Sequence, residues 1–151
     1  MQRDAESIAL SRLQDKCIGC GECLAMCRFG AVKYDWDAEN ELLQKNMAEH
    51  ALGVLKGKQG RAVFFNYVIS VAKDCDCFSR TDIPAIVDDI GILASADAVA
   101  IDKAAVDLVE TKGGKNLGKL LGNEKLNPRY QLEHAERIGL GTTDYELIEL
   151  D

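Results

Sequence analysis

The sequence lacks the long apolar runs and the basic excess that mark several large classes of protein. Its longest apolar run, residues 62–72, contains Asn66 and reaches only about half the length that a bilayer-spanning helix needs. Acidic residues outnumber basic ones by 25 to 18, and the net charge of -7 leaves no electrostatic footprint for nucleic acid or an anionic membrane. Residues 1–16 show no apolar core followed by a small-residue cleavage site. We therefore expect a cytoplasmic protein without nucleic-acid or membrane partners.

The usual combinations of catalytic residues are also missing. The chain has two histidines, His50 and His134, and both fall on predicted helices without a second ligand at helical spacing. We expect both at the surface. The stretch GGKNLGKL over residues 113–120 approaches a phosphate-binding loop, but Leu120 replaces the hydroxyl residue that would bind magnesium. A flexible basic loop is predicted there, and no acid, base or nucleophile for a stand-alone enzyme can be named.

What is present is a chain of 151 residues with 47% apolar content, enough for one compact domain with a small appended lobe. Helical spacing of Leu43, Met47 and Ala51 predicts a helix over 38–56 with one apolar face. The nearly continuous apolar stretch 62–71 predicts a buried central strand, parallel to a neighbour. A short strand is predicted over residues 31–34.

The second half of the chain continues with a strand over 90–94 and then a helix. Asp97 can cap that helix, which is expected to run to about Thr111 and to end at Gly113 and Gly114. Another helix is predicted to start at Asn127-Pro128 and to end at Gly139. The partial alternation over 145–150 predicts a terminal edge strand. The expected fold class is therefore α/β (mixed α+β).

Four of the six cysteines form a C-x2-C-x2-C-x3-C run within eleven residues, namely Cys17, Cys20, Cys23 and Cys27. In a reducing compartment such a group is better explained by metal than by disulfides. The two-residue gaps let one tight loop deliver three thiolates to a cubane cluster, and the glycines within the gaps allow its turns. Zinc sites normally use two separated pairs instead. The spacing therefore predicts one 4Fe-4S cluster.

The identity of the fourth ligand is open. Two complete clusters would need eight cysteines, so six limit the chain to one. Cys75 and Cys77 follow the predicted central strand, where α/β sheets place their sites. Either Cys27 completes the local cluster, or Cys75 or Cys77 supplies the missing thiolate; a homo-oligomer could also supply it. The Cys75 and Cys77 pair could instead bind a metal of its own, act as a redox couple, or be two ordinary loop residues.

Arg28 occupies the position after the run where such motifs usually carry proline. A cation there favours the more negative, reduced cluster and would raise its potential by tens of millivolts up to about 100 mV. The alternative is a solvated surface arginine without such an effect.

The stretch CIGCGECLAMCRFGAV resembles one half of a bacterial-type ferredoxin. A longer similarity includes MAEHALGVLKGKQGRAVFFNYV, the DCDC of residues 74–77, DIGILASADAVAIDKAAVDLV and QLEHAERIGLGTTDYELIEL. Together they resemble the C-terminal part of ferredoxin-containing members of the family called domain of unknown function 362. The resemblance implies that this chain corresponds to the second cysteine run and the C-terminal portion of those members. It also implies cluster ligation by Cys17, Cys20, Cys23 and Cys27, and it assigns no role to DCDC.

The expected organisation is thus a ferredoxin-like 4Fe-4S lobe over residues 1–36 and an α/β domain over 37–151. The leading hypothesis is an electron-transfer protein or subunit whose acidic surface attracts a redox partner with a basic docking surface. The alternative is a regulatory or assembly module in which the cluster is structural or redox-sensing. An enzyme that uses the cluster together with Cys75 and Cys77 is the least favoured hypothesis.

Overall fold

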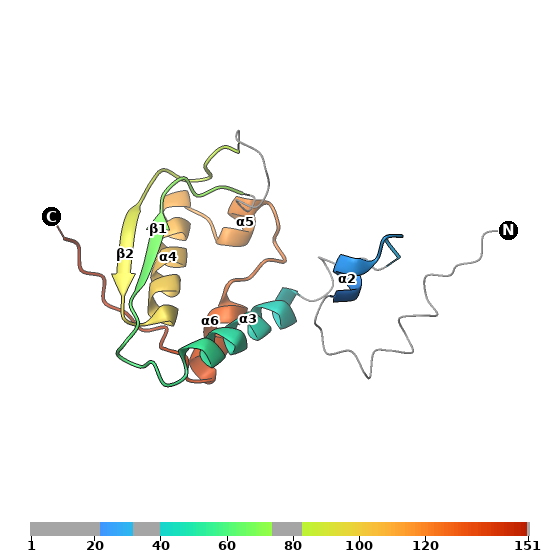
Figure 1. Ribbon diagram of the computed structural model, residues 1–151. Coiled ribbons are helices and arrows are strands. Elements are labelled where there is room, and N and C mark those ends of the chain that lie inside the picture. The colour runs from blue at the N-terminus through green and yellow to red at the C-terminus, as the bar shows by residue number, and fades with distance from the viewer. Residues whose placement is uncertain (1–21, 32–39, 74–82, 151) are drawn as a thin grey trace. The chain divides into compact units, whose positions relative to one another are not determined.

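The computed structural model describes residues 22–31, 40–73 and 83–150. The chain divides into two compact units, Met1–Ala38 and Glu39–Asp151, and each is described by itself. Over the described residues the protein is mixed α/β, with five helices and a two-stranded antiparallel sheet (Figure 1). None of these helices combines the length and the apolar character that crossing a bilayer would require.

The described part of unit 1 is short. Helix α2 (Glu22–Met26) is followed by a turn that ends at Gly30, where φ is 61°. The strand predicted over residues 31–34 lies outside the described residues except for Ala31. The ferredoxin-like character of this unit stays a prediction.

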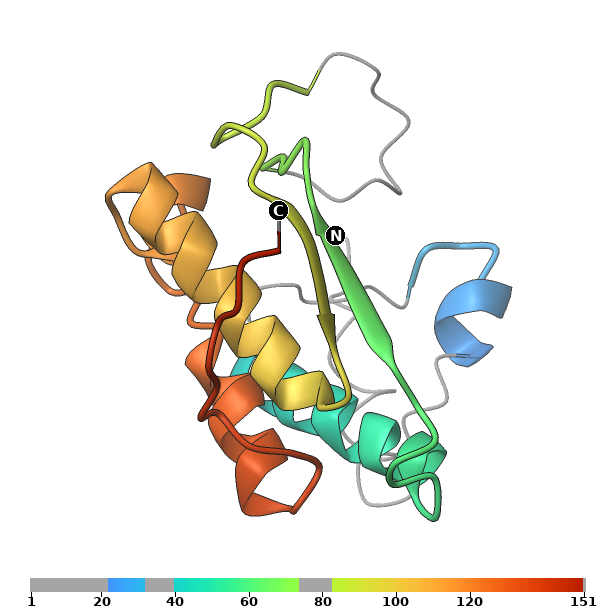
Figure 2. The same cartoon turned by 90° about the vertical axis from the view of Figure 1, so that its left-hand side faces the viewer.

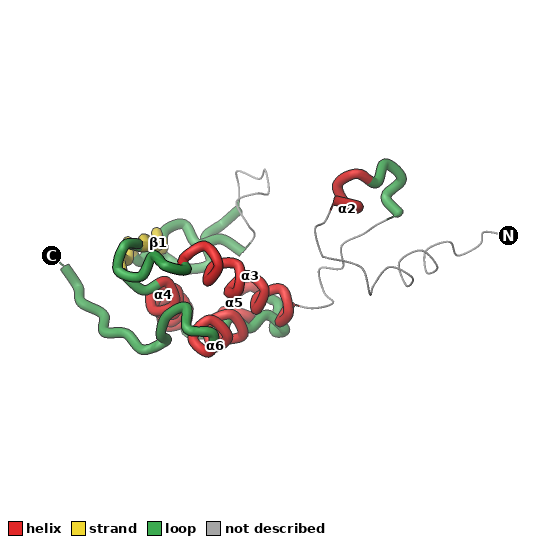
Figure 3. Tube along the Cα trace, turned by 60° about the horizontal axis from the view of Figure 1, so that its bottom comes forward, coloured by secondary structure: helices red, strands yellow, loops and turns green. Residues whose placement is uncertain are grey.

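Unit 2 begins with helix α3 (Asn40–Leu55), which confirms the helix predicted over 38–56 within the described residues. Its buried face differs from the predicted one. Leu43 and Met47 are 42% and 52% exposed, whereas Ala48 is only 3% exposed and packs with Leu132 and Ala135 of α6 (Arg129–Arg137). The small side chain of Ala48 lets the two helices approach closely, and Figure 3 shows α3 and α6 side by side.

The sheet consists of β1 (Phe64–Val68) and β2 (Gly91–Ser95), paired antiparallel with Phe64 opposite Ser95. The expectation of a buried central strand with a parallel neighbour is therefore wrong. Side chains alternate along β1, and among the described residues α4 (Ala98–Gly113) covers one face of the sheet and nothing covers the other. Phe65 and Tyr67 on the other face are 59% and 64% exposed. The run 62–71 is apolar because both faces of β1 carry apolar side chains, and the described residues bury one of these faces.

Helix α4 is the element against which most of unit 2 packs (Figures 1 and 2). The prediction of its start is confirmed, because Asp97 Oδ1 accepts hydrogen bonds from the N–H groups of Val99 and Ala100 at 2.8 and 3.0 Å. Its end at Gly113 is also confirmed. Gly114 there has a φ of 64°, the left-handed conformation that glycine adopts readily, and its N–H donates to the Thr111 carbonyl.

Asp97 also connects α4 to the chain that follows α6. Its Oδ2 accepts a hydrogen bond from the Thr142 N–H at 3.0 Å. Gly141 makes this approach possible, since a Cβ on residue 141 would lie 2.1 Å from Asp97 Oδ1. One carboxylate therefore holds the start of α4 and the segment after α6 together.

Helix α5 (Leu117–Leu121) begins within the segment 113–120, which was predicted as a flexible loop. Asn116 caps it by accepting a hydrogen bond from the Lys119 N–H at 2.9 Å, and Leu117 packs into the core beside Val109. The loop prediction was wrong because Asn116 acts as the N-cap of a helix and does not simply belong to a loop. Helix α6 confirms the prediction from Asn127-Pro128, and Gly139 follows its end.

The buried side chains form two clusters. One joins α3, α4 and α6 through Ala48, Val99, Leu132 and Ala135, and the other joins the sheet to α4 through Val68, Val87 and Val109. Residues 145–150, predicted as an edge strand, form no strand and pair with neither β1 nor β2. Leu147 and Ile148 are 54% and 71% exposed. This prediction was wrong because alternation alone does not supply a partner edge.

Candidate metal centre

Two of the predicted cluster ligands lie in the described residues, and α2 positions both. Cys23 is on the helix and Cys27 follows its last residue, so the two are four residues apart. Cys23 is exposed and Cys27 partly buried. Helix α2 and the residue directly after it therefore carry two of the four predicted ligands.

The turn after α2 aims a backbone amide at Cys27. The Ala31 N–H donates to Cys27 Sγ at 3.3 Å, and the Gly30 N–H donates to the Cys27 carbonyl at 3.3 Å. The positive φ of Gly30 produces this reversal of the chain. An amide directed at a cysteine sulfur stabilises the thiolate, and such hydrogen bonds tune iron-sulfur centres. The Cys27 sulfur therefore has a hydrogen bond of the kind that stabilises a thiolate ligand.

The remaining predicted ligands, Cys17, Cys20, Cys75 and Cys77, lie outside the described residues. Within the part of the chain that the structure describes, no three His, Cys, Asp or Glu side chains gather into a metal-binding group. The choice between Cys27 and the Cys75 and Cys77 pair as source of the fourth thiolate stays open. Arg28, in the turn directly after Cys27, is exposed to solvent.

A polar cluster that the sequence did not predict joins α3 to α6. His134 is 9% exposed, so the expectation of a surface position is wrong, whereas His50 is exposed as expected. His134 Nε2 lies 3.0 Å from Glu49 Oε1, and Arg137 Nη2 lies 2.5 Å from His134 Nδ1. We call Glu49, His134 and Arg137 the His134 clamp. No local pattern could have revealed it, because Glu49 and His134 are 85 residues apart in sequence.

The chemistry of the His134 clamp follows from its donors. A guanidinium only donates, so Nδ1 of His134 accepts from Arg137 and the ring proton resides on Nε2, which donates to the Glu49 carboxylate. Both ring nitrogens are therefore occupied. Neither remains for a metal or a substrate, and the His134 clamp serves to hold α3 against α6.

The comparisons with known proteins give one match. The search of the curated proteins and the search of the solved structures found no similar protein. A family model, described as a domain of unknown function (DUF362), matches residues 16–107, which is more than half of the chain. The matched region begins just before the cysteine run and extends into α4. The chain belongs to the DUF362 family.

Proposed function

We propose that the protein binds one 4Fe-4S cluster on unit 1 and acts as a ferredoxin-like electron carrier or redox subunit. The observation that carries this proposal is the run of Cys17, Cys20, Cys23 and Cys27, whose spacing is that of cubane iron-sulfur ligands. Membership of DUF362 adds no activity, since the family's function is unknown.

The described residues support the proposal through their placement. Two of the four cysteines lie on α2 and directly after it, and the turn that follows directs the Ala31 amide at Cys27 Sγ. This N–H offsets part of the negative charge that accumulates where several thiolates meet. A bound cluster would supply one-electron oxidation and reduction.

The net charge of the chain indicates which kind of protein partner is favoured. The chain carries a net charge of -7, so long-range attraction favours a partner with a basic docking surface and disfavours another acidic protein. Association with such a partner should slow steeply as salt is added.

Anaerobic purification of the full chain tests the cofactor. We expect a brown protein with about four irons and four sulfides per chain and a broad visible absorption that bleaches on reduction. A colourless protein that contains only zinc would refute the proposal.

Serine substitutions identify the fourth ligand. Cys27→Ser, Cys75→Ser and Cys77→Ser are compared for iron content and for the electron paramagnetic resonance signal of the reduced cluster. The change that removes the 4Fe-4S signal marks the fourth ligand, and the other two variants serve as matched controls. Reversible reduction without loss of iron supports a carrier. Loss of iron or of fold in each redox cycle supports instead the regulatory module in which the cluster senses oxidants.

A further inference from the structure

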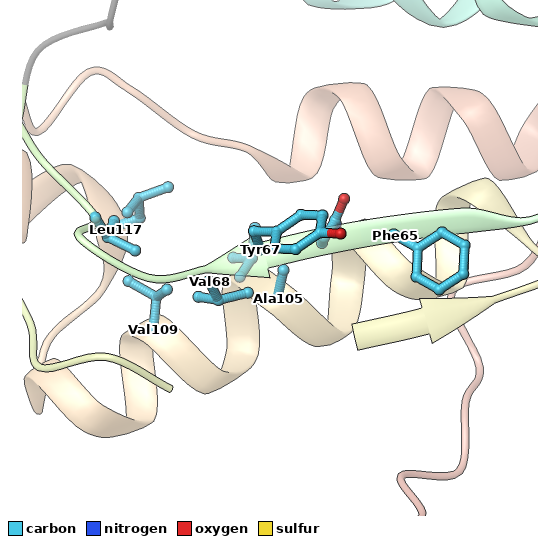
Figure 4. Close-up of a pocket in the computed structure, with 9 residues that line it drawn as sticks. Phe65, Tyr67, Val68, Ala105, Val109 and Leu117 are labelled. Carbon is cyan, nitrogen blue, oxygen red and sulfur yellow. The ribbon is translucent and has the colours of Figure 1, made fainter. Parts of the chain in front are cut away.

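An apolar groove of about 310 Å³ runs along the edge of β1 that β2 does not occupy (Figure 4). Strand β1 supplies one wall with residues such as Tyr67 and Val68. Helix α4 supplies the other with Ala105 and Val109, and Leu117 of α5 lies at one end. Because β1 pairs only with β2 in the described residues, its outer edge offers unused backbone N–H and C=O groups beside this groove.

The groove suits an added strand better than a compact ligand. A two-stranded sheet is marginal by itself, and a third strand on the β1 edge would pair with the backbone while its side chains enter the groove. Phe65 and Tyr67 are more than half exposed and would gain contacts from such a strand. Among the described residues no charged side chain lines the groove, and the side-chain amide of Asn66 there already donates to Asp102 Oδ1 at 2.8 Å.

One end of the groove is basic. Lys115 and Lys119 are exposed and lie two residues before and after the groove residue Leu117 in the sequence. Lys73, also exposed, lies two residues after the groove residue Val71. Glu110 adds one negative charge nearby, where its carboxylate accepts a hydrogen bond from the Leu117 N–H at 2.8 Å, but the three lysines outnumber it. An extended apolar segment that carries acidic residues would therefore match both the wall and the end of the groove.

The chain contains such a segment. Residues 145–150, with the sequence YELIEL, carry exposed Leu147, Ile148 and Leu150 together with Glu146 and Glu149, and they pair with neither strand. Fully extended, the five residues after Tyr145 span about 17 Å, which matches the length of the five-residue β1. We call residues 145–150 the C-terminal segment.

The C-terminal segment does not fill the groove of its own chain. The Tyr145 hydroxyl donates to Asp107 Oδ2 at 2.8 Å, and Lys103 lies 5.9 Å from the centre of the Tyr145 ring. With about 100° per residue, Asp107 and the groove residue Val109 are on opposite sides of α4. Figure 1 shows the C-terminal segment leaving on the β2 side of the sheet.

We propose that the groove binds the C-terminal segment of a second copy, so that two chains exchange these segments reciprocally in a dimer. Each segment stays attached to its own α4 through Tyr145 and extends onto the β1 edge of the other chain. Side chains alternate along a strand, so Ile148 and Leu150 enter the apolar groove, and Glu146 on the same face approaches the lysines at its end. Leu147 on the opposite face lies against Phe65 and Tyr67 of the other chain. Such an exchange is symmetric, and each chain supplies one groove and one segment.

Sedimentation of the full chain over a range of concentrations tests the dimer. Leu147→Asp with Leu150→Asp should weaken it at least about tenfold, since two apolar contacts are lost and charge is introduced into the groove. Val54→Asp is the matched control, because Val54 is 64% exposed on α3, outside groove and segment, and it should leave the association unchanged. The substituted leucines are exposed, and far-UV circular dichroism checks that the variants fold.

A charge exchange makes the test specific to the proposed surfaces. Glu146→Lys with Glu149→Lys in one chain, and Lys115→Glu with Lys119→Glu in another, should each reduce self-association. Mixing the two should restore it, because only the mixed dimer joins opposite charges at both grooves. A monomer at all concentrations, or a dimer that neither the leucine nor the charge variants affect, would overturn the proposal.

Discussion

The His134 clamp gives a stability prediction that can be worked from its geometry. His134→Ala removes the hydrogen bond to the Glu49 carboxylate, the hydrogen bond from Arg137 and a ring that is 9% exposed. Each hydrogen bond contributes about 1 kcal/mol, and we use this ordinary value for the Glu49 pair because that carboxylate is 58% exposed. Loss of the buried ring adds about 1 kcal/mol. We expect the free energy of unfolding to fall by about 3 kcal/mol.

Urea unfolding followed by far-UV circular dichroism measures this change, and hydrogen exchange locates it in α3 and α6. His50→Ala is the matched control, because His50 is exposed on α3 and should change stability by less than about 0.5 kcal/mol. A double-mutant cycle of Glu49→Ala with His134→Ala should give a coupling of about 1 kcal/mol. If His134→Ala is no more destabilising than His50→Ala, or the coupling is zero, the His134 clamp does not hold the two helices together.

Three further predictions concern separate parts of the chain. Arg28→Gln should lower the reduction potential by tens of millivolts up to about 100 mV in a redox titration; an unchanged potential would mean that Arg28 is simply solvated. Asp97→Ala should reduce the free energy of unfolding by about 2 kcal/mol and Asp97→Asn by less, because the cap of α4 and the bond to Thr142 are lost in the alanine variant. Hydrogen bonds from the Thr143 N–H and hydroxyl lower the pKa of Glu136 below its ordinary 4.5. Their stabilisation is therefore complete above pH 4.5 and is lost as the pH falls through the lowered pKa. The Thr143 amide NMR shift should titrate with a midpoint below 4.5, and a midpoint above it would contradict the assignment.

Local signals predicted the start of α4 and of α6 and the end of α4, but they did not predict α5. Asp97 before α4 and glycine after it are residues whose own chemistry starts and stops a helix, and both act as predicted. Asn127-Pro128 likewise placed the start of α6. In each case the atoms that cap the helix lie within a few residues of its end, so the sequence alone contains the information.

Strand pairing and burial depend on partners that are distant in the sequence, and the predictions of these two features were wrong. The apolar stretch around Phe65 and Tyr67 indicated a strand buried on both faces, but α4 covers only one. His134 was expected at the surface because its partner Glu49 is 85 residues away. For the metal centre, spacing predicted the type of cofactor, whereas the fourth ligand depends on three-dimensional proximity that spacing does not encode.

The pairing of α3 with α6 has a consequence for how the chain folds during synthesis. The sheet and α4 are close in sequence and can form early, but α3 must wait for α6, whose last residue is Arg137. The region matched to the family ends at residue 107, inside α4, so a fragment cut there would lack α6 and leave Ala48 and Val99 in water. The region that matches the family model therefore does not end where a unit that folds by itself would end. On the ribosome, unit 2 can close only after α6 has emerged.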